Sequence, residues 1–391
     1  MRRSTRPASL PLTSLLFTSA LLAQSAVDPS SPAAADSTVF RFTAADGAPL
    51  EAKLTRPDSE SPVPVVFYLH GAGPRTFDHP VGFREEDGTV RYRAYYDLHA
   101  QAFAARGVAF CAMSKRGCVA VEEPLSMDYD PKAFGEATLD VLLGDYERGL
   151  AALLQREGID AERVVFWGSS EGTRLAPMLA VARPDGVRGL VLTAFAADNA
   201  KDTVAWQNSV GPWRNVQAML PEARDGAVTR EEYDAALERA PGLGRALPFD
   251  QLKGDDGLFT SEDLVRAAKP RVEYLFNAIE NGDDERLRPL MLGLSSAYFK
   301  SWWDAPPTVE ILLPLSLPIS IFHGELDGTC RVEGVREVES AFEGEGKTNL
   351  AVHIYPELDH NLGWTRELAL RGGAQPFRDA VDAAVRMLTS R

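Results

Sequence analysis

The chain has 391 residues, a formal net charge of −15, and 45% hydrophobic and 25% charged residues. A chain of this length and composition can bury a large core, either as one elaborated α/β domain or as two smaller domains. The acidic balance leaves no basic surplus to neutralise phosphates, so it disfavours nucleic acid as a partner.

The first 25 residues are typical of a secretory signal peptide. Three arginines and no acid precede an apolar run over residues 10–23, which is too short to span a membrane. Ala23 and Ser25 place small side chains at the two positions that a signal peptidase reads. We therefore expect export to the periplasm or outside a bacterial cell. A flexible leader should follow over residues 26–37, and no membrane span is expected in the mature chain.

Three cysteines allow at most one internal disulfide. Cys111 lies in an apolar run, which favours a buried free thiol. Export would permit a bridge from Cys118, and the sequence leaves the disulfide state of Cys118 and Cys330 open.

Short apolar strands alternate with helices along most of the chain, after an opening hairpin over residues 39–43 and 50–55. The predicted strands cover residues 63–69, 108–113, 163–167, 187–194, 319–322 and 350–355. The predicted helices cover residues 94–106, 138–157, 172–182, 332–342 and 376–388. This alternation predicts an α/β fold: a mostly parallel sheet with helices on both faces, formed by residues 38–197 and 309–391.

Residues 198–308 interrupt the alternation with a pattern that is helical without strands, and we expect a cap over one end of the sheet. Two stretches, beginning at Asp225 and Asp256 and ending at Glu232 and Asp263, resemble the second half of an EF-hand calcium loop. Neither stretch carries the first two ligands of such a loop. An EF-hand-like helix pair without metal is therefore favoured, and a calcium site at these four acids is the alternative.

The segment Gly168-Ser169-Ser170-Glu171-Gly172 matches the pattern G-x-S-x-G in one register only, and this register selects Ser170. The segment follows a predicted strand and precedes a predicted helix. A tight strand-to-helix turn exposes the central hydroxyl and directs the next backbone N–H at a developing oxyanion. We predict that Ser170 is a nucleophile and that the Glu171 N–H is an oxyanion donor. A glycine turn without chemistry is the alternative.

A serine nucleophile needs a base and an acid that orients the base. His360 lies just after the last predicted strand, where the carboxyl ends of parallel strands form binding sites. His353 alternates with apolar residues inside that strand. Asp327 lies a few residues beyond the preceding strand. We predict His360 as the base and Asp327 as the acid, with Glu325 as the alternative acid.

The second oxyanion donor should come from the loop His70-Gly71-Ala72-Gly73, which follows the strand over residues 63–69. Its small residues let backbone N–H groups approach a substrate oxygen. We assign Gly71 and Ala72, and the sequence leaves open which N–H points inward. His70 is expected to support the loop, with a role as base as the alternative.

Taken in chain order, these motifs resemble the α/β-hydrolase superfamily. The resemblance rests on His70-Gly71, Arg116-Gly117, residues 168–172, Gly324 with Asp327, and His360. Residues 168–172 followed by Leu175-Ala176-Pro177-Met178 are similar to bacterial esterase-like hydrolases related to the serine aminopeptidase and dienelactone hydrolase groups. Two positions depart from that subgroup: Ser169 replaces a commoner histidine, and Thr173 replaces a glycine.

The resemblance implies a serine hydrolase that cleaves a small-molecule carboxylic ester through an acyl-enzyme, without a cofactor. A peptidase, an amidase or a thioesterase on the same residues stays open. A catalytically silent binding protein on the same fold is the alternative from another class. The acyl and alcohol specificity and the oligomeric state are not predicted.

Overall fold

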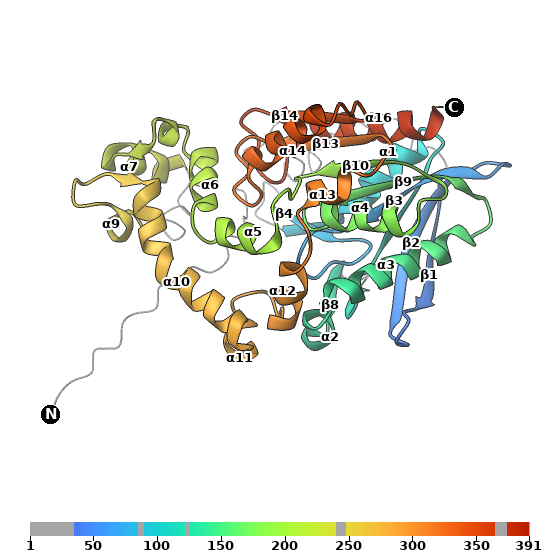
Figure 1. Ribbon diagram of the computed structural model, residues 1–391, viewed down its shortest axis with the longest axis horizontal. Coiled ribbons are helices and arrows are strands. Elements are labelled where there is room, and N and C mark those ends of the chain that lie inside the picture. The colour runs from blue at the N-terminus through green and yellow to red at the C-terminus, as the bar shows by residue number, and fades with distance from the viewer. Residues whose placement is uncertain (1–34, 85–89, 122–124, 240–247, 364–373, 391) are drawn as a thin grey trace.

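A computed structural model of the chain describes residues 35–84, 90–121, 125–239, 248–363 and 374–390 (Figure 1). The expected signal peptide and most of the expected leader lie outside these residues, and export stays a prediction. Strand β1 (Ala35–Thr43) begins earlier than the leader was expected to end, because residues 35–37 already pair with residues 55–57. Within the described residues, no helix is both long and apolar enough to cross a membrane.

Eight strands form one central sheet in the order β1-β2-β6-β3-β9-β10-β13-β14. β1 and β2 (Pro49–Pro57) are antiparallel at one edge, and β2 is also antiparallel to β6 (Ala109–Met113). From β6 onward all neighbouring strands run parallel: β3 (Val63–Leu69), β9 (Ile159–Ser169), β10 (Val187–Thr193), β13 (Ile319–Gly324) and β14 (Leu350–Tyr355). The predicted fold class is therefore confirmed.

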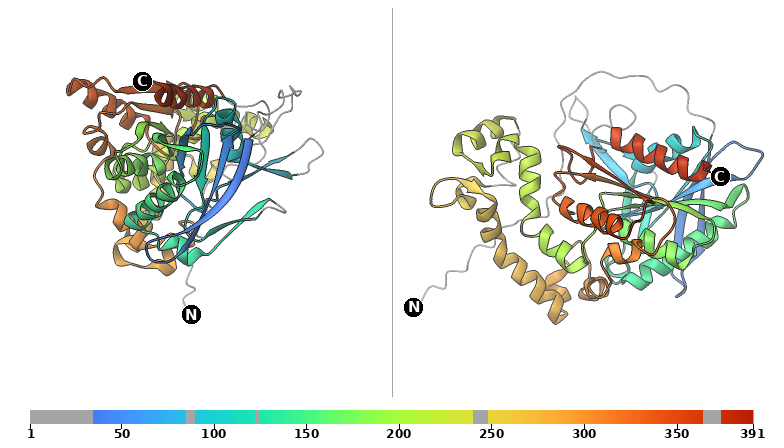
Figure 2. Two further views of the ribbon diagram at one scale, coloured as in Figure 1. Left: turned by 90° about the vertical axis from the view of Figure 1, so that its right-hand side faces the viewer. Right: turned by 45° about the horizontal axis from the view of Figure 1, so that its top comes forward.

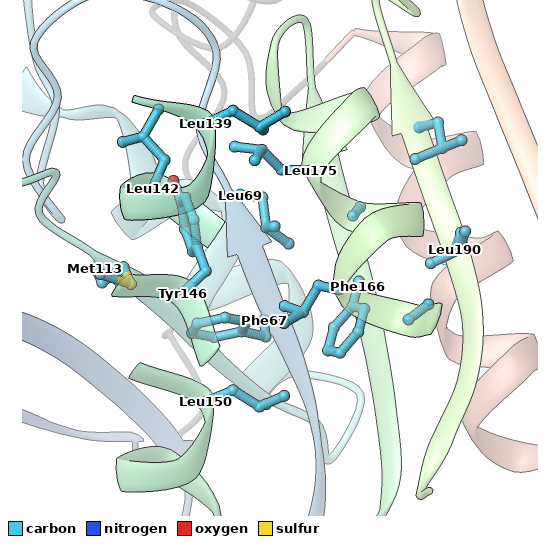
Figure 3. Close-up of a cluster of buried hydrophobic side chains, with 14 of the residues drawn as sticks. Phe67, Leu69, Met113, Leu139, Leu142, Tyr146, Leu150, Phe166, Leu175 and Leu190 are labelled. Carbon is cyan, nitrogen blue, oxygen red and sulfur yellow. The ribbon is translucent and has the colours of Figure 1, made fainter. Parts of the chain in front are cut away.

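Helices cover both faces of this sheet (Figures 1 and 2), and β3 shows why its sequence is apolar throughout. Phe67 and Leu69 point to the face covered by α3 (Leu139–Leu154), α4 (Gly172–Ala182) and α14 (Val332–Gly344), while Tyr68 points to the face covered by α1 (Tyr95–Ala104) and α16 (Gln375–Thr389). In Figure 3, Leu69 lies between Tyr146 and Leu175, and Phe67 lies between Tyr146 and Phe166. A strand buried on both faces loses polar–apolar alternation.

Two small hairpins and one short helix were not predicted. β4 (Pro80–Arg84) pairs with β5 (Val90–Ala94) after β3, and β7 (Cys118–Val121) pairs with β8 (Ser126–Tyr129) after β6, followed by α2 (Pro131–Gly135). These strands lie in connections outside the main sheet, and they lack long apolar runs. The three cysteines are buried free thiols, so the possible bridge from Cys118 does not form.

The insertion between β10 and β13 is mainly helical. It contains α5 (Ala200–Gln207), α6 (Gly211–Met219), η1 (Pro221–Asp225), α7 (Arg230–Arg239), α9 (Phe249–Leu252), α10 (Ser261–Asn281), α11 (Asp284–Leu287), α12 (Ser296–Trp303) and α13 (Thr308–Leu312). In Figure 1, α6, α7 and α9 stand apart from the sheet, whereas α12 and α13 lie close to it. The insertion therefore has one part beside the core and one part that carries its own apolar cluster.

The expectation of a region without strands is wrong at one point. β11 (Ala227–Val228) pairs antiparallel with β12 (Phe259–Thr260), so the two EF-hand-like stretches lie side by side. Val228 and Phe259 are fully buried in the apolar cluster of this part of the insertion. Two residues per strand are too few to produce a period in the sequence, although their apolar side chains provide the contact.

The last acid of each EF-hand-like stretch takes part in a helix cap. The Asp263 carboxylate accepts hydrogen bonds from the Thr260 N–H and hydroxyl, and the Glu232 carboxylate does the same for Thr229. Across the described residues, Asp225, Glu232, Asp256 and Asp263 do not form a cluster of three ligand atoms. The arrangement fits a helix pair held by apolar contacts and capping boxes.

Candidate active site

The predicted site residues come together at one edge of the sheet. His70 directly follows β3 and Ser170 follows β9, while Asp327 and His360 lie in the loops after β13 and β14. These strands are parallel neighbours, except that β10 lies between β9 and β13, so their carboxyl ends share an edge. This is the position where open α/β sheets bind ligands.

Ser170 adopts a left-handed backbone conformation with φ of +53° at the turn from β9 into α4. This conformation is unfavourable for residues other than glycine, and it persists where the surrounding structure fixes it. The flanking glycines permit it. A Cβ on Gly168 would lie 2.3 Å from the Gly172 carbonyl oxygen, and a Cβ on Gly172 would lie 2.1 Å from that of Leu69. The turn therefore requires glycine on both sides of the serine.

Ser170, His360 and Asp327 form a continuous hydrogen-bonded chain. His360 Nε2 lies 3.1 Å from Ser170 Oγ, and His360 Nδ1 lies 2.7 Å from Asp327 Oδ2. Since the ionised Asp327 can only accept, His360 Nδ1 carries the proton and Nε2 is free to accept one from the serine. The three residues have the geometry of a nucleophile, its base and an orienting acid.

Asp327 is buried and remains ionised because its surroundings supply donors. Its Oδ1 accepts the backbone N–H groups of Thr329 and Cys330, at 2.7 and 2.8 Å. Burial alone would raise the pKa of Asp327, but the charge and hydrogen bond of His360 and the weaker effects of His323 and Cys330 outweigh it, so this pKa is lowered. The acid is therefore charged at neutral pH.

His360 is more basic than an ordinary histidine. Burial alone would lower its pKa, but the negative charge and the hydrogen bond of Asp327 outweigh burial and raise the pKa above its usual value of 6.5. A base with a pKa near the working pH is well suited to take a proton and return it.

Two backbone N–H groups are available beside Ser170. Within the described part of the chain, neither the Ala72 N–H nor the Glu171 N–H donates a hydrogen bond. The loop after β3 lies directly against the serine, since a Cβ on Gly71 would be 3.1 Å from Ser170 Cβ. Unpaired N–H groups next to a nucleophile are suited to bind an oxyanion.

His70 supports this loop from behind. Its Nδ1 lies 2.8 Å from the Tyr96 hydroxyl and its Nε2 lies 2.5 Å from the Met113 carbonyl oxygen. Burial, followed by the charge of Lys115, lowers the pKa of His70 to about 3. Nε2 faces a carbonyl and must carry the proton, so His70 is neutral and both nitrogens are engaged. The geometry does not fit the alternative role of His70 as a base.

The other candidates lie elsewhere. Glu325 accepts a hydrogen bond from Arg336, 3.0 Å away, instead of one from His360. His353 stacks on Phe322 with ring centroids 4.7 Å apart. Arg116, part of the motif Arg116-Gly117, pairs with Asp145 and Asp46. The structure thus brings Asp327, not Glu325, to the base.

A cavity of about 400 Å³ opens beside Ser170, between the sheet and the insertion. This volume is within the range of small-molecule sites, about 300–1,000 Å³. Ala72 and Glu171 also line it. Most of its wall is apolar, with side chains that include Leu252, Leu264, Leu290, Met291, Phe299 and Trp302.

Sequence reasoning left the roles of Ser169 and Thr173 open. The Thr173 hydroxyl donates to the Ser170 carbonyl oxygen and accepts the Ala196 N–H, 3.0 Å away, so it ties the turn to the chain that follows β10. The Ser169 side chain makes a polar contact with Tyr68 that offsets part of the rise that burial causes in the pKa of the Tyr68 phenol. Both departures from the subgroup therefore have structural roles that local pattern alone does not reveal.

Three further residues at the site were missed. Lys115 and Tyr298 both contact the Glu171 carboxylate, and His323 lies behind Asp327, with its Nε2 3.6 Å from Asp327 Oδ2. Lys115 had a usable signal, because a lysine just after a buried strand lies at the ligand-binding edge of the sheet. Tyr298 had none, because its contact depends on how the insertion folds back.

Neither family models nor curated protein sequences give a match to the chain. Among solved structures, a lipase in its open form has a TM-score of 0.51 at 17% identity, over 91% of this chain and 100% of the lipase. The α/β hydrolase GrgF from Penicillium sp. sh18 has a TM-score of 0.49 at 13% identity, over 91% of this chain and 100% of its own. An esterase from the archaeon Pyrobaculum calidifontis has a TM-score of 0.49 at 13% identity, over 90% of this chain and 83% of the esterase.

The fold assignment rests on the likeness to the lipase together with the observed sheet and turn. An eight-stranded, mostly parallel sheet with helices on both faces carries Ser170 on a strand-to-helix turn at its carboxyl edge. The chain therefore has the α/β-hydrolase fold.

Proposed function

We propose that the protein is a serine hydrolase that cleaves carboxylic esters through an acyl-enzyme. The observation that carries this proposal is the continuous chain from Asp327 through His360 to Ser170, which ends beside two unpaired backbone N–H groups. Ser170 and His360 are only partly buried, whereas Asp327 is buried beneath them. Their arrangement at the mouth of an apolar cavity supports a chemical role.

In the first half of the reaction, Ser170 Oγ attacks the ester carbonyl carbon while its proton passes to His360 Nε2. The carbonyl oxygen becomes an oxyanion, which accepts hydrogen bonds from the Glu171 N–H and from the loop after β3. Asp327 stabilises the imidazolium through the 2.7 Å hydrogen bond to Nδ1. His360 then returns the proton to the departing alkoxide, and the C–O bond of the ester breaks.

In the second half, His360 Nε2 takes a proton from a water molecule that attacks the acyl carbon. The same two N–H groups stabilise the second oxyanion. Collapse of this intermediate breaks the bond to Ser170 Oγ, and His360 protonates the serine as the acid leaves. Every proton transfer passes through His360, so the proposed mechanism needs no reactant besides the ester and water.

The apolar wall favours esters with an apolar acyl or alcohol group. A panel of p-nitrophenyl esters from acetate to dodecanoate, with the matching anilides and thioesters, tests the proposal. We expect ester turnover with an initial burst of p-nitrophenol and loss of both in a Ser170→Ala variant. Turnover of anilides or thioesters in preference to esters would favour the amidase or thioesterase function. If no substrate reacts and no burst appears, the protein is not an esterase of this kind.

A further inference from the structure

Lys115 is a buried lysine at the edge of the site that the reaction above does not use. It follows β6, and its side chain is 2% exposed. Its Nζ donates to Glu171 Oε1 at 2.6 Å and to the Gly71 carbonyl oxygen at 2.7 Å. A buried ammonium is costly unless it is paired and hydrogen-bonded. These two partners therefore fix its position.

The contact with Gly71 determines how the next peptide group is turned. In a planar trans peptide, the carbonyl and the following N–H point in opposite directions. Because Lys115 holds the Gly71 oxygen on one side, the Ala72 N–H is directed to the other side, where Ala72 and Ser170 both line the cavity. If this peptide flipped, a carbonyl oxygen would face the oxyanion and repel it.

Glu171 links this contact to two other parts of the chain. Its backbone follows the nucleophile, and its carboxylate joins Lys115 to the hydroxyl of Tyr298. Tyr298 belongs to α12 of the insertion and is buried. Burial, and then the charge of Glu171, raises the pKa of Tyr298 well above its usual value, so the phenol stays protonated and donates. One buried network thus connects the loop after β3, the turn at Ser170 and the insertion.

We propose that Lys115 is a positioning residue that orients the Gly71–Ala72 peptide so that the Ala72 N–H is the second oxyanion donor, and that Tyr298 of the insertion holds this network in place. The proposal rests on the proposed serine hydrolase function. Lys115 acts through Gly71, so its loss should weaken binding of the transition state more than binding of the substrate.

The main test is the double variant Lys115→Met with Glu171→Gln, which removes both buried charges and leaves neither one unpaired. The readouts are kcat and KM for the best ester, and the inhibition constant of an alkyl trifluoromethyl ketone. Ser170 Oγ adds to the carbonyl carbon of this ketone to form a hemiketal, and the serine proton passes to His360. The former carbonyl oxygen becomes an oxyanion that lies against the donors. Removing one oxyanion donor lowers kcat by a factor of about 10²–10³. We expect losses of about 10² in kcat and in ketone affinity, with KM changed by less than about threefold.

Lys53→Met is the matched control. Lys53 is also a largely buried lysine, and it pairs with Asp78 at 2.8 Å and Asp97 at 3.0 Å, outside the site. The Lys53→Met variant should be less stable than the wild type, while its kcat and ketone affinity stay at the wild-type values. Tyr298→Phe keeps the proposal testable if the double variant does not fold. It should weaken ketone affinity by about 2- to 13-fold, the equivalent of one hydrogen bond, and by more than it raises KM.

The outcomes separate the two proposals. If the wild type turns over ester but the folded double variant keeps kcat and ketone affinity within about threefold, Lys115 does not position the donor. Equal rises in KM and in the inhibition constant of the Tyr298→Phe variant would overturn the role of Tyr298. A wild type that reacts with neither ester nor ketone overturns the serine hydrolase function and, with it, the role of Lys115.

Discussion

Replacing Asp327 by asparagine should stop the reaction through the tautomer of His360. Asp327 Oδ1 accepts two backbone N–H groups, those of Thr329 and Cys330, and Oδ2 accepts one N–H from His360. An asparagine has a single amide oxygen, so it must give up one of these sets. Keeping the oxygen on the two backbone donors retains two hydrogen bonds rather than one, an advantage of about 1 kcal/mol. The opposite orientation would also place an NH₂ group against two donors.

The asparagine NH₂ group therefore faces His360 Nδ1 and donates to it. His360 then carries its proton on Nε2, 3.1 Å from Ser170 Oγ, and cannot accept the serine proton. In a triad of another serine hydrolase, this substitution lowers kcat by about 10⁴. The same factor corresponds to about 5.4 kcal/mol of transition-state stabilisation at 1.36 kcal/mol per tenfold. We expect a loss of this size here.

The assay is kcat for a p-nitrophenyl ester, together with nitrogen NMR shifts of the imidazole, which report the tautomer. Asp359→Asn is the control, because Asp359 also lies beside His360 in sequence but accepts hydrogen bonds from Asn361. It should retain most of the wild-type kcat. The reasoning is refuted if folded Asp327→Asn keeps more than about a tenth of kcat, or if it loses activity while His360 keeps its proton on Nδ1.

Three further outcomes follow from the geometry. Because the neutral form of His360 is the base and its pKa is raised, kcat/KM should rise with pH through a pKa above 6.5, and a profile that is flat from pH 5 to 8 would contradict this. Gly172→Ala should prevent folding, since its Cβ would lie 2.1 Å from a carbonyl oxygen, whereas Gly144→Ala, in an open position of α3, should stabilise the chain by about 0.5–1 kcal/mol in urea unfolding. Thr260→Ala should lower the free energy of unfolding by about 1 kcal/mol, because the cap of α10 is lost. Calcium or EDTA should leave the melting temperature of the wild type unchanged, and a rise in this temperature at micromolar calcium would contradict the metal-free helix pair.

The strands of the central sheet and the positions of Ser170, His360 and Asp327 could be predicted because each has a signal in the sequence. Continuous apolar runs reveal the buried strands, and the glycines around Ser170 reveal a turn that no other residue type fits. Asp327 and His360 follow from chain order and from the rule that parallel strands present their carboxyl ends at one edge. In each case a short stretch of sequence contains the physical requirement.

The remaining features depend on contacts between distant segments. The proposed choice of Ala72 over Gly71 as oxyanion donor rests on the contact of Lys115, which is 44 residues away from Gly71 in sequence. Tyr298 reaches Glu171 across 127 residues. No periodicity or spacing links such positions. The contact of Lys115 emerges only when β6 pairs with β3, and that of Tyr298 only when the insertion folds against the sheet. The two-residue strands β11 and β12 were missed because so short a pairing leaves no pattern.

Covalent labelling with a fluorophosphonate tests the central claim most directly, because the probe reacts with an activated serine whatever the natural substrate is. Trypsin should release residues 164–174 as one peptide, between Arg163 and Arg174, and this peptide contains both candidate serines. We expect one adduct per chain on Ser170, equal labelling of a Ser169→Ala variant, and no labelling of Ser170→Ala. Absence of an adduct on the folded wild type, or an adduct on Ser169 instead of Ser170, would contradict the account.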